Sequence, residues 1–472
     1  MNYLINDTTL SSIADAIRNK TGDSAQMEVS NMASEISSIV TEPAQMEKTI
    51  RHNGEYNASD EPIYGYSKVI VDVEPLPTVY GFHIDTNESD STACITYLES
   101  AVGATPAYMD FANSKWEWGS WENAFFMPRP CMLKSDGTVD YYLDPNDYTK
   151  KLDGTASDVA DLTYDGNAMM EWGRDGHKIW IKIVPDEGTD TSASIYIANG
   201  QVDDDYTAYP FINKNGNYVD HFYTAIYNGS VSDGKMRSIS GTKTAENQTA
   251  AKQRETAMAN NPTGKDIWDM GLKSDIDLIN FLLILITKSL DVKTKIGYGM
   301  ATGSQAAMEA YTLGGLNDKG LFFGYSENTN VVKAFGMENW WGFQWKRYLG
   351  HFLNNNTYKI KLCYGRSDGS TTDDYNLTGS GYVSKITAPS EGYVKEMSYS
   401  NTMLTKTTGS PASSSNYYKA YFYKNASGLR MAFFGGGPSS GTSVSPFYVY
   451  VSNDPSYSYW SVGSFLSCKP LA

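Results

Sequence analysis

The chain has 472 residues, of which 38 are basic and 54 acidic, so its formal net charge is −16 at pH 7. Nucleic acid and anionic lipid both repel a protein of this charge, and neither is expected as a main partner. Hydrophobic residues make up 41% of the chain, and 35 tyrosines and 10 tryptophans add area that folding can bury, so we expect a globular protein of several domains.

Four cysteines stand at isolated positions, without the paired spacing of a disulfide framework or a zinc site. They are Cys94, Cys131, Cys363 and Cys468. The first residues lack the basic region and apolar run of a secretory signal, and the longest apolar run, Phe281–Ile286, is far shorter than the ~20 residues of a membrane span. We therefore expect synthesis in a cytoplasm without a signal peptide, and no membrane insertion.

Residues 1–40 predict two short helices. The apolar residues of the first recur at the spacing of one helix face, at Leu10, Ile13, Ala14 and Ile17, with Asp7 or Thr8 as the cap and Thr21-Gly22 as the end. The second has Met32, Ile36, Ile39 and Val40 on one side. Two such helices bury too little to be stable alone, so they form either an attachment or oligomerisation module or a local cap on the next domain.

Residues 41–77 predict a β linker module. In the segment GYSKVIVDVEP, the residues Val69, Val71 and Val73 alternate with Lys68, Ile70 and Asp72. Pro75 and Pro77 close the segment and mark a domain boundary.

These first 77 residues resemble a family of tail proteins. LSSIADAIRNKTG followed by MASEISSIV is similar to a helical module near the N-termini of tail proteins of phages and prophages of Gram-positive bacteria. KTIRHNGEYNASDEPIYGYSKVIVDVEP is similar to a segment of the same proteins; Gly54 and Gly65–Ser67 match its pattern, whereas His52 and Glu55 depart from it. The resemblance implies a protein of the virion, located in the phage tail.

Residues 78–204 predict a β-rich domain. HKIWIKIVP alternates Ile179, Ile181 and Ile183 with other residues, and TSASIYIANG is its expected partner strand. Asp136-Gly137 is the expected turn of a hairpin.

The organisation changes from residue 205 onward. AYPFINKNGNYVDHFYTAIYNG predicts two short strands, and TAENQTAAKQRETAMAN predicts a helix. A stronger helix is expected to begin at Ser274, with Asp277 completing a capping box. Its apolar stripe consists of Ile279, Leu282, Leu283, Ile286 and Leu290. This stripe predicts that the helix is buried.

This order of elements resembles the C-type-lectin-like fold, in particular its formylglycine-generating-enzyme-like branch and the variable proteins of diversity-generating retroelements. The motifs that carry the resemblance are Asn339–Trp345, Leu429–Gly437 and the terminal SVGSFLSCKPL, which lacks the arginine usual in the last strand. The resemblance implies a ligand-binding domain over 205–472, and an α+β, multidomain chain with an N-terminal helical hairpin and a β-rich middle domain.

The last sixty residues combine a strand pattern with a tyrosine-rich composition. Phe447, Val449 and Val451 alternate with Tyr448 and Tyr450, which predicts one core face and one face of tyrosines. Tyr417, Tyr421 and Tyr423 alternate similarly with Ala420 and Phe422. Tyrosine, serine and asparagine are typical of recognition surfaces; an ordinary amphipathic strand with half-buried tyrosines is the alternative.

Adenine mutagenesis by a diversity-generating retroelement would produce the same residue types, and residues 453–459 fit that pattern; ordinary loop composition is the alternative. The candidate ligand-binding residues are Tyr417, Tyr421, Tyr423, Tyr448, Tyr450, Asn453, Asp454, Tyr457, Tyr459 and Trp460.

No pattern of reaction chemistry accompanies these residues. The five histidines have no metal-ligand spacing, and the paired cysteines or histidine-rich iron site of the enzymes in this fold branch have no counterpart. The acidic runs Asp203–Asp205 and Asp373-Asp374 are open to calcium binding or simple solvation, and solvation is preferred. We expect no catalytic residue, metal or cofactor.

The resulting hypothesis is a phage tail receptor-binding protein, not an enzyme. It would be a homotrimer that contacts other tail or baseplate proteins and a bacterial surface receptor, either protein or glycan. A tail-associated cell-wall or polysaccharide hydrolase and a purely structural baseplate protein are the alternatives, since paired carboxylates of a hydrolase cannot be placed from sequence.

Overall fold

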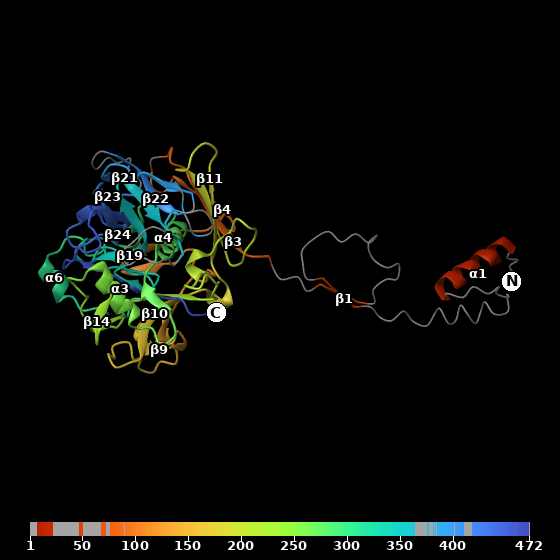
Figure 1. Ribbon diagram of the computed structural model, residues 1–472, viewed down its shortest axis with the longest axis horizontal. Helices are drawn as coiled ribbons and strands as arrows, with labels where there is room; N and C mark the ends of the chain where they lie inside the picture. Colours follow the sequence, from red (N-terminus) through yellow and green to blue (C-terminus); the bar gives the residue numbers. More distant parts are fainter. Residues whose placement is uncertain are drawn as a thin grey trace. The chain divides into compact units, whose positions relative to one another are not determined.

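The computed structural model describes residues 7–21, 47–50, 68–71, 76–88, 90–363, 375–376, 381, 383, 385–400, 402–409 and 418–471. The chain divides into two compact units, Met1–Leu76 and Pro77–Ala472. The protein is mostly β, with several sheets and few helices (Figure 1).

The first unit contains one described helix, α1 (Asp7–Thr21), which confirms the predicted helix and its end at Thr21. Ala14 and Ile17 are buried on its apolar side. Two short strands, β1 (Glu47–Ile50) and β2 (Lys68–Val71), pair in parallel. The second helix, expected near residues 32–40, falls outside the described residues.

The second unit begins with a four-stranded antiparallel sheet in the order β11-β12-β3-β4. Its strands are β3 (Val79–Ile84), β4 (Ile95–Glu99), β11 (Trp180–Pro185) and β12 (Ala193–Ala198). The pairing of β11 with β12 confirms the two partner strands predicted from the sequence. A small hairpin, β5 (Tyr108–Asp110) and β6 (Lys115–Glu117), follows β4 in the chain.

A seven-stranded sheet has the order β16-β27-β13-β10-β7-β8-β9. The strands are β7 (Arg129–Lys134), β8 (Val139–Asp144), β9 (Asp147–Lys151), β10 (Gly166–Trp172), β13 (Phe222–Ala225), β16 (Trp268–Met270) and β27 (Leu466–Cys468). The predicted turn at Asp136-Gly137 is confirmed, because Gly137 has a φ of +87° between β7 and β8. This sheet joins strands from both sides of residue 205, so it is continuous across the domain boundary predicted there.

An eight-stranded sheet completes the framework in the order β20-β19-β24-β25-β23-β21-β22, with β26 (Val462–Gly463) parallel to β19. Its other strands are β19 (Trp345–Asn354), β20 (Thr357–Ile360), β21 (Gly392–Tyr399), β22 (Met403–Gly409), β23 (Tyr421–Lys424), β24 (Leu429–Gly435) and β25 (Ser445–Val451). Strands β23 and β25 are parallel to each other.

Short elements connect these sheets. The helices are α3 (Ala250–Met258), α4 (Lys273–Thr287), α5 (Val292–Ile296) and α6 (Gln305–Ala310), with 3-10 turns η2 (Arg174–Gly176), η3 (Tyr209–Phe211) and η4 (Gly441–Ser443). The two-stranded hairpins are β14 (Ser230–Ser232) with β15 (Lys235–Arg237) and β17 (Lys333–Ala334) with β18 (Met337–Glu338). Of the two strands predicted near 208–229, only β13 forms; the first half is η3 and a single bridge between Ile212 and Tyr218.

Helix α4 is buried on every side, and Figure 1 draws it near the middle of the second unit. Its predicted burial is confirmed, but the predicted cap is wrong. The helix begins after Leu272, whose backbone N–H donates to the Asp275 carboxylate at 3.1 Å. Ser274 lies inside the helix, and Asp277 instead contacts Lys273 and Thr402 in the core. The capping role therefore falls to Asp275, because tertiary contacts engage Asp277.

Side chains of α4 contact all three large sheets. The ring of Phe281 lies 6.5 Å from Phe82 of β3 and 6.4 Å from Tyr399 of β21. Asn280 donates from Nδ2 to the Pro446 carbonyl of β25 at 3.1 Å. At the start of the helix, Asp275 accepts from Lys469 Nζ at 3.0 Å, just beyond β27 of the seven-stranded sheet.

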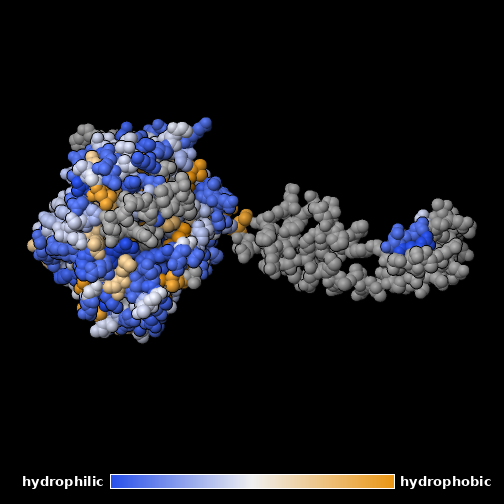
Figure 2. Space-filling view, viewed as in Figure 1, coloured by the Kyte–Doolittle hydropathy of each residue, from blue (hydrophilic) through white to orange (hydrophobic). Residues whose placement is uncertain are grey.

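The surface of this unit is mostly hydrophilic on the face drawn in Figure 2, where hydrophobic residues form small, separate groups. Within the described ranges, no helix is long and apolar enough to cross a membrane. Lys182 Nζ lies 2.9 Å from the carboxylates of both Asp203 and Asp205, so these two acidic residues are partners of a lysine. The pair Asp373-Asp374 lies outside the described residues.

We expect Lys469→Met to lower the free energy of unfolding by about 3–5 kcal/mol, because it leaves the Asp275 carboxylate buried without its cation. Both side chains are fully buried. Urea denaturation followed by tryptophan fluorescence measures the change. Lys252→Met, which removes an exposed pair with Glu255, is the control and should cost less than about 1 kcal/mol. Equal unfolding free energies for Lys469→Met and the wild type would contradict this role of the pair.

Candidate ligand-binding surface

Strand β25 separates a core face from a face of tyrosines, as its alternation predicts. Phe447 and Val451 are almost completely buried, and Val449 is half-buried. Tyr448 and Tyr450 point to the other face and are also half-buried. Their rings therefore combine a packed edge with an accessible one.

The parallel neighbour β23 extends this face. Phe422 pairs with Val449 and Tyr423 pairs with Tyr450, so the two strands present their tyrosines in register. The rings of Tyr423 and Tyr450 stack at a centroid distance of 4.9 Å with 14° between their planes. Tyr423 keeps 37% of its surface exposed.

Two rings from other strands form the floor. Trp345 of β19 lies 4.7 Å from the ring of Tyr448 and 5.4 Å from that of Tyr450. Phe433 of β24 stacks on Tyr450 at 5.8 Å with 1° between the planes. Both floor residues are buried, so the tyrosines rest on a packed base.

The run of rings continues into the segment after β25. Tyr457 stacks on Phe433 at 6.4 Å, Tyr459 lies 6.0 Å from Tyr457, and Trp460 lies 5.7 Å from Tyr459. We name this set the aromatic face; it comprises Trp345, Tyr393, Tyr421, Tyr423, Phe433, Tyr448, Tyr450, Tyr457, Tyr459 and Trp460. Its outermost member is Tyr459, 45% exposed.

The structure brings together most of the residues proposed from the sequence. Seven lie in the aromatic face: Tyr421, Tyr423, Tyr448, Tyr450, Tyr457, Tyr459 and Trp460. Asn453 and Asp454 lie in the loop of residues 452–461 beside it, whereas Tyr417 lies outside the described residues. Trp460 also packs against the small cluster around Phe343, so part of its ring serves the core.

Sequence reasoning missed Trp345, Tyr393 and Phe433. Trp345 stands in the motif assigned to the lectin-like core, and the other tryptophans of that motif do serve the core. Trp340 donates from Nε1 to Asn280 of α4 at 3.3 Å, and Trp341 donates to the Gly297 carbonyl at 3.0 Å. Tyr393 contacts Tyr421 at 5.1 Å across the β21–β23 pair, a proximity that only the strand order reveals.

The 452–461 loop is held mainly through its backbone carbonyls. Six of them accept hydrogen bonds from outside the loop: Asn453 from Met431 N at 3.0 Å, Pro455 from Ala250 N at 2.9 Å, Tyr457 from Arg347 Nη2 at 2.7 Å, Tyr459 from Asn247 N at 3.2 Å, Trp460 from Gln344 Nε2 at 3.3 Å and Ser461 from Trp345 N at 2.9 Å. Every residue type carries a backbone carbonyl, so these six hydrogen bonds do not require particular side chains in the loop.

Arg347 is central to this support. Its guanidinium is fully buried, contacts the face of Phe433 at 5.0 Å, and donates to Gln253 Oε1 at 2.8 Å as well as to the loop. Burial lowers its pKa to about 10, which leaves it charged at neutral pH. A planar guanidinium with several fixed donors suits a site that must hold two chain segments at once.

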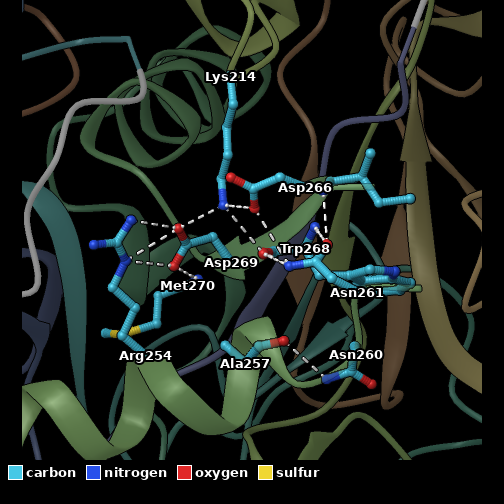
Figure 3. Close-up of polar contacts among 10 residues, drawn as sticks. Lys214, Arg254, Ala257, Asn260, Asn261, Asp266, Trp268, Asp269 and Met270 are labelled. Carbon is cyan, nitrogen blue, oxygen red and sulfur yellow. Dashed lines mark hydrogen bonds and ion pairs between the residues drawn. The ribbon is translucent and has the colours of Figure 1, made fainter. Parts of the chain in front are cut away.

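Helix α3 holds the other side of the loop and is itself anchored by a buried carboxylate (Figure 3). Asp269 of β16 is fully buried and lies 3.0 Å from Arg254 Nη2 of α3 and 3.0 Å from Lys214 Nζ. The N-terminal residue of this helix, Ala250, donates to the loop. A chain of contacts therefore connects the seven-stranded sheet with the candidate surface.

The electrostatics of the face favour binding by neutral groups. Burial, and the neighbouring rings of Tyr421 and Tyr450, raise the pKa of the Tyr448 hydroxyl, and burial also raises the pKa values of Tyr450 and Tyr457. These hydroxyls stay protonated at neutral pH and can both donate and accept. The arrangement offers wide ring faces with neutral polar tips, which suits binding.

No protein-family model matches the chain, and no curated protein matches it. Among solved structures, the chain is similar to the "Major Tropism Determinant U1 Variant", with 10% identity, a TM-score of 0.28 and 73% of each chain covered. The P3c variant has 11% identity and a TM-score of 0.24, covering 73% of this chain and 72% of that chain. The M1 variant has 9% identity and a TM-score of 0.24, covering 74% and 73%. TM-scores this low do not establish a shared fold.

We expect Arg347→Lys to loosen the 452–461 loop, because a lysine cannot keep the three contacts of the guanidinium. Loss of a hydrogen bond to a buried charged group costs about 1.5–3 kcal/mol, so amide hydrogen exchange in the loop should accelerate by roughly 10- to 100-fold. Amides of β10 should be unaffected. Arg430→Lys, which alters a 3.8 Å pair with Asp454 and an exposed hydrogen bond to the Ser427 carbonyl, is the control. Unchanged loop exchange in Arg347→Lys would contradict the assignment.

The neighbouring Lys346 generates a pH dependence. It is buried, donates to the Asn339 carbonyl, and burial lowers its pKa to about 7. Between pH about 7 and about 10 the unfolded chain binds a proton here that the folded chain does not, so this lysine makes stability rise with pH.

Removing Lys346 should therefore flatten the pH profile. We expect the unfolding free energy of the wild type to rise, relative to that of Lys346→Met, by up to about 1.4 kcal/mol per pH unit in this window, with no further change below it. Urea denaturation at a series of pH values measures both proteins. Parallel profiles for the two proteins would show that Lys346 keeps its ordinary pKa in the fold.

Proposed function

We propose that the chain is a phage tail receptor-binding protein whose aromatic face binds a bacterial surface ligand without altering it. The observation that carries this proposal is the run of half-exposed tyrosines on a packed floor. Tyr423 and Tyr459 are the most exposed of these rings, at 37% and 45%. Large amphipathic rings that are already ordered lose little entropy on binding and are the usual anchors of recognition surfaces.

The packing of the face supports preorganisation. Tyr450 is fixed between Tyr423 and Phe433 by near-parallel stacking. The loop that carries Asn453, Asp454 and Tyr459 is fixed through its backbone. Ordering these side chains is therefore completed during folding, and a ligand does not bear that cost.

We further propose a role for each segment of the chain. Residues 205–472 form the C-type-lectin-like portion, while residues 1–40 attach the chain to the tail and assist formation of a homotrimer, with 41–77 as the linker. Several copies in one virion would raise the effective concentration of binding sites, so weak contacts at each face would add up to firm adsorption.

Diversification by a retroelement fits the way in which the 452–461 loop is held. Because the loop is supported mainly through carbonyl oxygens, replacing its outward side chains changes the chemistry of the surface at little cost to folding. The proposal predicts a nearby reverse transcriptase gene and a template copy that differs from this region at adenines only. A neighbourhood without either would remove this part of the proposal.

We expect the double variant Tyr423→Ala and Tyr459→Ala to bind cells at least about tenfold more weakly than the wild type, because truncating a central aromatic anchor costs roughly 2 kcal/mol or more. Fluorescently labelled full-length protein is titrated onto intact cells from a panel of Gram-positive strains. Tyr218→Ala is the matched control, because Tyr218 is 43% exposed and stands outside the aromatic face. It should bind as the wild type does.

The same experiment separates the alternatives. Equal binding by the double variant and the wild type would rule out the aromatic face as the receptor site. Binding to no strain would favour a structural baseplate role, and sustained release of reducing sugars from purified cell walls would favour a hydrolase. Urea midpoints of all variants, compared with that of the wild type, check that loss of binding is not loss of fold.

A further inference from the structure

A second concave surface lies outside the aromatic face. It is a groove of about 740 Å³ whose walls come from the start of β6 with the Trp118–Glu122 segment, the turn between β8 and β9, and residues 318–325. This volume falls within the roughly 300–1,000 Å³ typical of small-molecule sites. None of the residues of the aromatic face lines it.

Three rings form a fixed corner in this groove. Trp116 stacks on Phe322 at a centroid distance of 4.4 Å with 12° between the planes. Trp118 stands perpendicular to both, at 6.1 Å from Trp116 and 5.6 Å from Phe322. Phe322 is buried and packs on Phe335 at 4.8 Å, so the corner is anchored in the core. The two tryptophans are half-buried and line the groove.

The charges around the corner cancel. Lys115, Glu122, Asp318 and Lys319 line the groove, two of each sign, in a chain whose net charge is −16. Lys319 lies 3.3 Å from Asp318, and Lys115 lies 2.7 Å from Glu117. An ionic ligand of either sign would be repelled by two groups of the same charge and would have to break these ion pairs. A neutral ligand would not.

We propose that this groove binds a neutral oligosaccharide. Pyranose rings have apolar C–H faces that fit flat against indole rings, and a perpendicular pair of rings can contact two sides of one sugar. Hydroxyl groups at the ring edges can both donate and accept, which matches a rim where ammonium groups, carboxylates and the Asn146 amide stand together. The groove thus supplies the combination of aromatic walls and a few polar groups that fixes a small polar ligand.

This site shares no residue with the receptor surface proposed above, although Trp116 and Trp460 pack against the same buried cluster around Phe343. The corner and its rim stand on β6, on the β8–β9 turn and on residues 318–325, whereas the aromatic face stands on β19, β21, β23, β24, β25 and the 452–461 loop. Substitution of one surface therefore leaves the residues of the other in place. Either proposal can fail while the other stands.

The experiment applies the labelled full chain to an array of neutral and acidic glycans, followed by calorimetry with chitotetraose, maltotetraose and an oligogalacturonate. We expect retention on neutral glycans, with binding of at least one of the two neutral probes in calorimetry. Trp118→Ala should weaken that binding at least tenfold. Asn146→Arg, an exposed substitution in the β8–β9 turn that places a longer, charged side chain in the lining of the groove, should weaken it similarly. The double variant Tyr423→Ala and Tyr459→Ala should bind these glycans as the wild type does.

Three results would overturn the proposal. They are the absence of binding to every neutral glycan, binding to the oligogalacturonate alone, and neutral-glycan binding that survives both Trp118→Ala and Asn146→Arg. Because Asn146→Arg replaces none of the three packed rings, it keeps the test decisive if Trp118→Ala fails to fold. Loss of cell binding by the tyrosine variants, with glycan binding retained, would support both sites separately.

Discussion

The burial of helix α4 is the constraint on which the second unit depends. A helix without an exposed side must find partners for its polar groups inside the protein, because water is not available to satisfy them. At the start of the helix, the Asp275 carboxylate accepts from the backbone N–H of Leu272 and from Lys469 Nζ. Further along, the Asn280 side chain donates to the Pro446 carbonyl of β25. These contacts fix the positions of the seven- and eight-stranded sheets relative to one helix. The aromatic face is the outer side of one of those sheets, so its geometry follows from a contact made in the core.

Local patterns in the sequence predicted elements well where burial and periodicity agreed. The alternation in β25, the pairing of β11 with β12, the Asp136-Gly137 turn and helix α1 all depend on neighbouring residues, and all are confirmed. Long-range polar contacts could not be predicted in this way. The sequence predicted a capping box of Ser274 and Asp277, and only the positions of Lys273 and Thr402 assign Asp277 to the core.

The candidate site shows the same division. The tyrosines of the aromatic face were predictable, because tyrosines alternate with apolar residues along two strands. Its floor was not, because Phe433 resembles any core residue until β24 is placed next to β25. The order of strands in a sheet is a property of the whole chain, and sequence alone does not supply it. The supporting role of Arg347 was hidden for the same reason, since its partners Gln253 and Tyr457 are 94 and 110 residues away.

The placement of β27 has a consequence for how the protein is made. This strand lies between β13 and β16 in the seven-stranded sheet, although more than two hundred residues separate it from β13 in the chain. Until Leu466–Lys469 emerges from the ribosome, β13 and β16 face a vacant position and their edges stay open to wrong partners. The seven-stranded sheet can therefore close only after residues 466–468 have been synthesised. A cell that produces the chain must keep these two strand edges from wrong partners until then.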